Sequence, residues 1–65
     1  MLTRNKWTIR CAARLMAAGG CKDYEAAHLA RELAEAMAEL NGASGAAWPP
    51  PEDVADEEMA EWADE

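Results

Sequence analysis

The sequence predicts an all-α protein: an antiparallel helical hairpin followed by a C-terminal acidic helix, in a small helical bundle that dimerises. Three observations support this prediction. Alanine supplies much of the apolar content, while the 65 residues include one Ile, one Val and no Phe, a composition that favours helices over strands. Apolar side chains recur at helical spacing. A Gly-Gly pair, a Gly/Ala/Ser stretch and a proline run separate the helical segments.

The first helix is predicted over residues 4–18, with Thr3 as its N-cap and Gly19-Gly20 as its stop. Its apolar side chains form two patches on different sides, one of Trp7, Cys11, Leu15 and Ala18 and the other of Ile9, Ala12 and Met16. A surface helix needs only one apolar face. We therefore expect this helix to be covered from two directions, by the second helix and by something else.

The second helix is predicted over residues 24–41, with Asp23 as N-cap and Asn41-Gly42 at its end. One face is apolar, made of Ala26, Leu29, Ala30, Leu33, Ala36, Met37 and Leu40. An adjoining edge is lined by Ala27, Ala34 and Ala38, which would let a neighbouring helix approach closely. A short turn joins the first two helices, so they should be antiparallel neighbours.

Residues 42–51 are predicted to be a linker, with Trp48 anchored on the bundle before three prolines. Pro51 suits the first position of a third helix over residues 51–64, on which Ala55, Met59, Trp62 and Ala63 share one side. The whole chain, 1–65, is expected to be one small domain. A domain of this size is marginally stable alone, so we expect a homodimer formed through the surplus apolar surface of the first helix.

Charge is sorted along the chain. Residues 1–22 hold five of the six basic side chains and no acid, and residues 52–65 hold eight of the 13 acids and no base, for a net charge of −7. Such polarity indicates either that the tail folds onto the head or that the two signs face different partners.

No pattern of residues predicts catalysis. Cys11, Cys21 and His28 lack the close pairing that marks a zinc site. There is no Gly-rich phosphate loop and no nucleophile motif. We expect no enzyme activity, no metal and no cofactor. We also find no signal-peptide pattern and no membrane helix, and expect a cytoplasmic protein whose thiols stay reduced.

The acidic third helix is the leading candidate for function. We interpret the chain as a non-enzymatic binding protein that blocks or regulates a larger protein through a negatively charged surface. The partner would carry a basic surface, for example one that binds nucleic acid. The predicted contact residues are Glu32, Glu39, Glu57, Glu58, Met59, Glu61, Trp62 and Asp64. Amphipathic helices dock in this way, and Trp is a favoured anchor.

The same segment has a second interpretation, in which Met59 and Trp62 pack the helix on the hairpin and its acids face solvent; the two are compatible. In type, the chain is similar to small acidic helical inhibitors from phages and mobile elements, including anti-CRISPR and DNA-mimic proteins.

The alternative function is a dimeric nucleic-acid-binding regulator. Lys6, Arg10 and Arg14 are spaced i, i+4, i+8 and form one basic stripe on the first helix. In plan, the chain is similar to the dimeric helical hairpins that bind paired RNA loops in plasmid copy-number control. Against this alternative, acids outnumber bases, so the stripe can pair with the chain's own carboxylates and the net charge repels nucleic acid.

Overall fold

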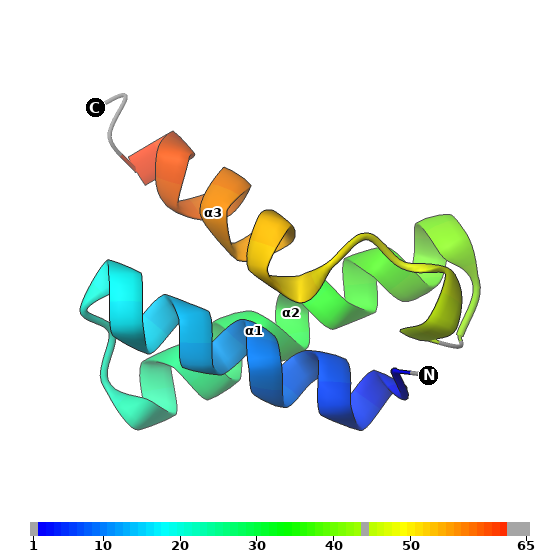
Figure 1. Cartoon of the computed structure of the whole chain (residues 1–65), viewed down its shortest axis with the longest axis horizontal. Helices are drawn as coiled ribbons and strands as arrows, with labels where there is room; N and C mark the ends of the chain where they lie inside the picture. The colour runs from blue at the N-terminus through cyan, green and yellow to red at the C-terminus, as the bar shows by residue number, and fades with distance from the viewer. Residues whose placement is uncertain (1, 44, 63–65) are drawn as a thin grey trace.

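The described part of the chain, residues 2–43 and 45–62 of a computed structural model, is helical with no strand. Its elements are α1 (Arg4–Gly19), α2 (Asp23–Asn41), the short 3-10 helix η1 (Gly45–Ala47) and α3 (Pro51–Trp62). The predicted all-α class is confirmed. Figure 1 shows α1 and α2 running in opposite directions, and α3 returning in the direction of α1.

The ends of α1 follow the sequence closely. The Thr3 hydroxyl accepts a hydrogen bond from the backbone N–H of Lys6 at 3.2 Å, which satisfies one of the free donors of the first turn. At the other end, Gly20 has a φ of 70°, a left-handed conformation that glycine adopts without steric cost. Thr3 and the glycine pair therefore set the two ends of the helix as predicted.

The start of α2 differs from the prediction, because Asp23 is the first helical residue and not the N-cap. The cap position is Lys22, whose side chain has no acceptor for a capping bond. Instead, the carboxylate of Glu25 accepts the backbone N–H of Lys22 at 3.1 Å. With Asp23 and Glu25 both in the first turn, two negative charges lie near the positive end of the helix dipole.

The predicted apolar face of α2 is also partly wrong. The fully buried stripe consists of alanines, Ala26, Ala30 and Ala34, each at most 1% exposed. The larger side chains beside it, Leu29, Leu33 and Met37, are only partly buried, and Ala36 and Leu40 are exposed. Small side chains let two helix backbones approach closely, so the side of α2 that carries Ala26, Ala30 and Ala34 is the one that packs against α1.

Helix α1 is the centre of the fold, since it packs against α2 and against α3, while α2 and α3 make little contact with each other. Its Trp7, Cys11 and Leu15 are fully buried. The expected cover from two directions is confirmed, but the second patch is not the covered one: Ile9 is 60% and Met16 40% exposed. The side of α1 that carries Arg10 and Arg14 faces α3 instead.

α1 and α3 lie in parallel at one fixed register. The indole Nε1 of Trp7 donates to the carbonyl of Pro49 at 2.8 Å, at a sequence separation of 42 residues. Arg10 with Glu52, and Arg14 with Asp56, repeat that separation of 42. Equal offsets one turn apart along both helices are possible only if the helices run in the same direction.

The linker is anchored by its tryptophan, as predicted. Trp48 is 7% exposed, and its ring meets that of Trp7 edge-on, with centroids 5.1 Å apart and planes at 83°. Its Nε1 donates to the carbonyl of Gly42 at 2.8 Å. This contact closes the chain between α2 and α3 and places Pro51, which is buried, as the first residue of α3.

Candidate partner-binding surface

The inner edge of α3 neutralises two of the three cations in the predicted basic stripe. Arg10 donates to both carboxylate oxygens of Glu52, at 3.0 and 2.9 Å. Arg14 likewise donates to both oxygens of Asp56, at 2.8 and 3.1 Å. Such two-bond pairs between guanidinium and carboxylate are the strongest type of ion pair. The tail of the chain therefore does fold onto its head.

The ion pair between Arg14 and Asp56 shifts the pKa of both residues. The hydrogen bond from Arg14 lowers the pKa of Asp56 below the ordinary aspartate value. The same hydrogen bond, with the charge of Asp56, raises the pKa of Arg14. Both shifts favour the charged forms, so the pair persists at neutral pH.

The outer edge of α3 carries a second row of carboxylates. Asp53, Glu57 and Glu61 are spaced four residues apart and are exposed. No ion pair found between described residues includes any of the three. At about 1.5 Å of rise per residue, consecutive members of this outer acidic row lie about 6 Å apart along the helix axis.

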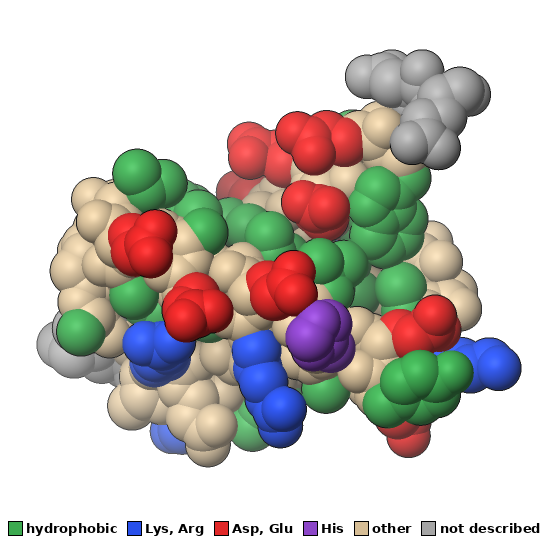
Figure 2. All heavy atoms as spheres, turned by 180° about the vertical axis from the view of Figure 1, so that it is seen from behind, with side chains coloured by type: hydrophobic (Ala, Val, Ile, Leu, Met, Phe, Trp, Pro, Cys, Tyr) green, Lys and Arg blue, Asp and Glu red, His purple; other side chains and the backbone are tan. Residues whose placement is uncertain are grey.

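Hydrophobic side chains on α2 and at the end of α3 form a strip on one face of the molecule (Figure 2). We call it the apolar strip, and define it as the partly buried Leu29, Leu33 and Met37 of α2 with Trp62 of α3. Trp62 is 41% exposed, and its Nε1 donates to Glu58 at 3.3 Å. Figure 2 shows acidic side chains over α3 and over α2 on one face of the molecule, with hydrophobic side chains between them.

One carboxylate of α2, that of Glu32, borders the strip on its other side. Glu32 and Glu39 are exposed and stand seven residues apart, on the same edge of the helix. Glu32 lies one turn from Leu29 and also contacts the His28 imidazole, whose Nε2 is 2.8 Å from its Oε1. Glu32 therefore adds negative charge beside the strip on α2, opposite the acids of α3.

The structure brings most of the predicted contact residues to these two helices. Glu32 and Glu39 lie on α2; Glu57, Glu58, Glu61 and Trp62 lie on the strip side or outer side of α3. Met59 instead packs inward, since a Cβ on Gly19 of α1 would come within 2.8 Å of its Sδ. Asp64 lies outside the described residues.

Two elements of this surface were not anticipated from the sequence. Asp53 belongs to the outer acidic row, and its spacing of four residues from Glu57 was a signal that could have identified it. The second is the apolar strip: Leu29 and Leu33 pack against the core, as their positions on the apolar face predict, but both remain partly exposed. Local periodicity indicates which residues share a face, but not which part of that face a neighbouring helix covers.

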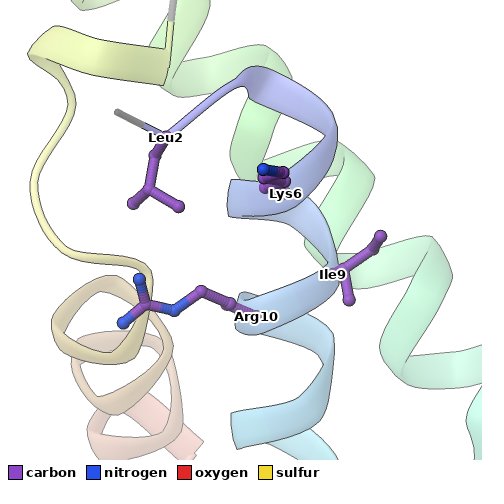
Figure 3. A pocket seen from close by; sticks show the side chains of 4 residues that line it. All are labelled: Leu2, Lys6, Ile9 and Arg10. Carbon is purple, nitrogen blue, oxygen red and sulfur yellow. The ribbon is translucent and has the colours of Figure 1, made fainter.

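The remaining cation of the basic stripe borders a separate hollow. Leu2, Lys6, Ile9 and Arg10 line an open depression of about 500 Å³ at the start of α1. Figure 3 shows the guanidinium of Arg10 extending towards the start of α3, whereas Ile9 points away from it. Lys6 is thus the exposed member of the predicted stripe that keeps no carboxylate partner among the ion pairs of the described chain.

The titratable groups that could support catalysis are dispersed. Burial, followed by the charges of Glu52 and Glu58, raises the pKa of the Cys11 thiol to about 11, so this buried thiol stays protonated at neutral pH. Both cysteines are free. Within residues 2–43 and 45–62, no three His, Cys, Asp or Glu side chains are grouped to hold a metal ion. None of the helices in these ranges is both long and apolar enough to cross a membrane.

Comparison with protein-family models, with curated proteins and with solved structures finds no match to this chain.

Proposed function

We propose that this chain is a non-enzymatic binding protein, which covers a basic surface of a larger protein with the carboxylates of α2 and α3 and thereby blocks or regulates it. One observation supports this proposal most strongly. Glu52 and Asp56 already neutralise Arg10 and Arg14, whereas the outer acidic row, Asp53, Glu57 and Glu61, is exposed and takes part in no ion pair of the described residues.

The spacing of this row suits a site that normally binds nucleic acid. One charge about every 6 Å of helix axis corresponds to roughly every second phosphate of a DNA strand, which rises about 3.4 Å per nucleotide. A net charge of −7 on 65 residues would also accelerate encounter with a basic partner at low ionic strength. An inhibitor of the DNA-mimic type, such as those of phages and mobile elements, would use its charge in this way.

Direct binding of nucleic acid is less favoured by the ion pairs. To contact phosphate, Arg10 and Arg14 would each have to give up a two-bond pair with a carboxylate of α3. The phosphate would also approach the negative charge of Glu52 and Asp56. We expect the chain to pass unretained through immobilised DNA or RNA at low salt.

The experiment uses two variants with the same change of charge. The full chain, Glu57→Lys and Glu35→Lys are each immobilised and exposed to lysate of the source cells, and proteins released by added salt are identified. Glu35 is exposed on α2 and in no ion pair found in the described chain. It lies beyond Glu32 around the helix, about 120° from Leu29, so it faces away from the apolar strip. We expect one basic protein to be retained by the native chain and by Glu35→Lys, and lost with Glu57→Lys.

The proposal is wrong if Glu35→Lys and Glu57→Lys retain the same proteins equally well. Retention of the native chain on nucleic acid, with a steep decrease on adding salt, would instead support the basic stripe as the functional surface. In that case Lys6→Glu should abolish retention.

The proposal includes a homodimer formed through α1. Ile9 and Met16 are exposed on the side of α1 that neither α2 nor α3 covers. This side is far less acidic than the surfaces of α2 and α3, because α1 contains no Asp or Glu. Sedimentation equilibrium should give twice the chain mass, and Ile9→Lys should give the monomer mass.

A further inference from the structure

We propose that the apolar strip binds one cationic amphipathic helix of the partner protein, with its apolar face on the strip and its basic side chains against the carboxylates of α2 and α3. This inference rests on the proposed function and specifies the partner element that the acidic surface recognises. It differs from a flat DNA-mimic contact, which would need the charges but not the apolar side chains between them.

The fold itself contains an example of this recognition. On its inner edge, α3 holds a basic helix, α1, in parallel: two carboxylates spaced four residues apart pair with two arginines spaced four residues apart. Below these ion pairs, apolar side chains of both helices join one core, with Ala55 of α3 and Cys11 of α1 fully buried. Thus charge at the edge and apolar contact beneath it already bind one basic helix to α3.

The outer edge of α3 repeats the row of carboxylates, spaced four residues apart, that its inner edge carries. Glu57 and Glu61 are four residues apart, as Glu52 and Asp56 are, and both are exposed. Across the apolar strip, Glu32 supplies a carboxylate from α2. An incoming helix with arginine or lysine on both sides of an apolar face would meet negative charge along each of its edges (Figure 2).

The strip has the composition of a docking surface for a helix. Trp62, a residue type that often anchors interfaces, is 41% exposed, and Leu29 and Leu33 are incompletely covered by the chain's own helices. Since α2 and α3 make little contact with each other, a third helix can lie along both. A helix of the partner would therefore bury the parts of Leu29, Leu33 and Trp62 that the chain's own helices leave exposed.

The acidic side chains beside the apolar strip disfavour a second copy of this chain as its binding partner. A second chain would bring the acids of its own α2 or α3 against those that flank the strip. Its α1 would offer Arg4 and Lys6, since Arg10 and Arg14 are already paired. A helix with several unpaired cations along an apolar face is the complementary ligand.

Two synthetic peptides of the same composition test the inference on the full chain. One, of about 18 residues, places leucines on one face and arginines on the rest at a period of about 3.6 residues. The other contains the same residues in an order that scatters the leucines around the helix. Trp62 reports binding, because Trp7 and Trp48 are 0% and 7% exposed and Trp62 is 41% exposed. We expect a blue shift of the tryptophan emission with the amphipathic peptide, and no such shift in Trp62→Phe.

Affinity should depend on both the pattern and the surface. We expect the scattered peptide to bind at least about tenfold more weakly than the amphipathic one, a difference of about 1.4 kcal/mol. Glu57→Lys with Glu61→Lys should weaken binding of the amphipathic peptide by a similar factor, and Glu35→Lys should leave it unchanged. The Glu61→Lys change lies in the last turn of α3, where a cation suits the helix dipole. Circular dichroism checks that the double variant keeps the fold.

Each contrary result has a distinct meaning. Equal binding of both peptides, lost in the double Lys variant, would overturn helix docking and leave the acidic surface of the proposed function intact. Binding unaffected by the double Lys variant would overturn the assignment to this surface. Absence of any peptide binding would overturn the inference, while the lysate capture with Glu57→Lys and Glu35→Lys separately decides the proposed function. Self-association of the native chain that Glu57→Lys abolishes would identify a second copy as the occupant.

Discussion

At the scale of single residues, two glycines allow close approach between segments distant in the sequence. A Cβ on Gly45 of η1 would come within 2.9 Å of the carbonyl carbon of Thr3 and 3.0 Å of the backbone nitrogen of Arg4. A Cβ on Gly19 would meet the side chains of Met59 and Trp62, at 2.8 and 3.2 Å. The neighbours differ in kind: backbone in the first case, and in the second the flexible side chain of Met59 together with the partly exposed ring of Trp62.

This difference predicts unequal effects of adding one methyl group. Gly45→Ala should lower the free energy of unfolding by about 1–3 kcal/mol, because backbone at the start of α1 must move. Gly19→Ala should stay within about 1 kcal/mol of the native chain, because Met59 can turn aside and alanine favours the helix. Urea denaturation of both variants measures the two values. An unchanged free energy of unfolding in Gly45→Ala would show that η1 does not pack against the start of α1.

The buried thiol of Cys11 predicts a pH dependence at the alkaline end. Its pKa is raised from 9.0 to about 11, so in the unfolded chain the thiol loses its proton first. Ionisation therefore stabilises the unfolded state, and the contribution of Cys11 is complete below pH 9 and lost as the pH rises towards 11. The free energy of unfolding should fall more steeply over this range in the native chain than in Cys11→Ala. Parallel curves for the two proteins would place the thiol in contact with water.

At the scale of elements, α3 is part of the fold and not an appended tail. Pro51, Val54 and Ala55 are buried in the same core as Trp7 and Leu15 of α1. The hydrogen bond from Trp7 to Pro49 and the two arginine pairs of α1 all lie along this one contact. Deleting α3 would therefore disturb the core as well as the acidic surface.

A chain ending at Pro50 should lose its cooperative unfolding transition. Trp7 and Leu15 would be exposed along one side, and each large apolar side chain uncovered costs about 1.5–3 kcal/mol. For a domain of this size, whose total stability is small, a loss of that order is enough to unfold it. Thermal melting followed by circular dichroism tests this. A truncated chain that melts as sharply as the native one would show that α1 and α2 fold without α3.

At the scale of the whole molecule, the sequence was sufficient for the three α-helices, but not for the 3-10 helix η1 inside the predicted linker or for the register between α1 and α3. Thr3, Gly20 and Pro51 act through local geometry, so α1 (Arg4–Gly19) and the start of α3 followed from single residues and their neighbours. Residues 63 and 64 of the third predicted helix lie outside the described part of the chain. The cap of α2 was misassigned because Asp23 suits both the cap and the first turn.

The register between α1 and α3 depends on contacts between residues that are distant in the sequence. Pairing of the basic stripe with the chain's own acids was foreseen as a possibility, but not which acids would pair. The choice of Glu52 and Asp56 depends on the length of the linker and on Trp48 packing against Trp7. Periodicity within one helix carries no information about such contacts, and for the same reason it did not show that Leu29 and Leu33 would stay partly uncovered.

The central claim is that the carboxylates on the outer side of α3 form the contact surface for the partner. Carbodiimide labelling of exposed carboxylates, compared between the free chain and its captured complex, tests it most directly when mass spectrometry locates the labels. Glu57 and Glu61 should be labelled in the free chain and protected in the complex, while Glu35 is labelled equally in both. Protection of Glu35 with full labelling of Glu57 and Glu61 would contradict the account.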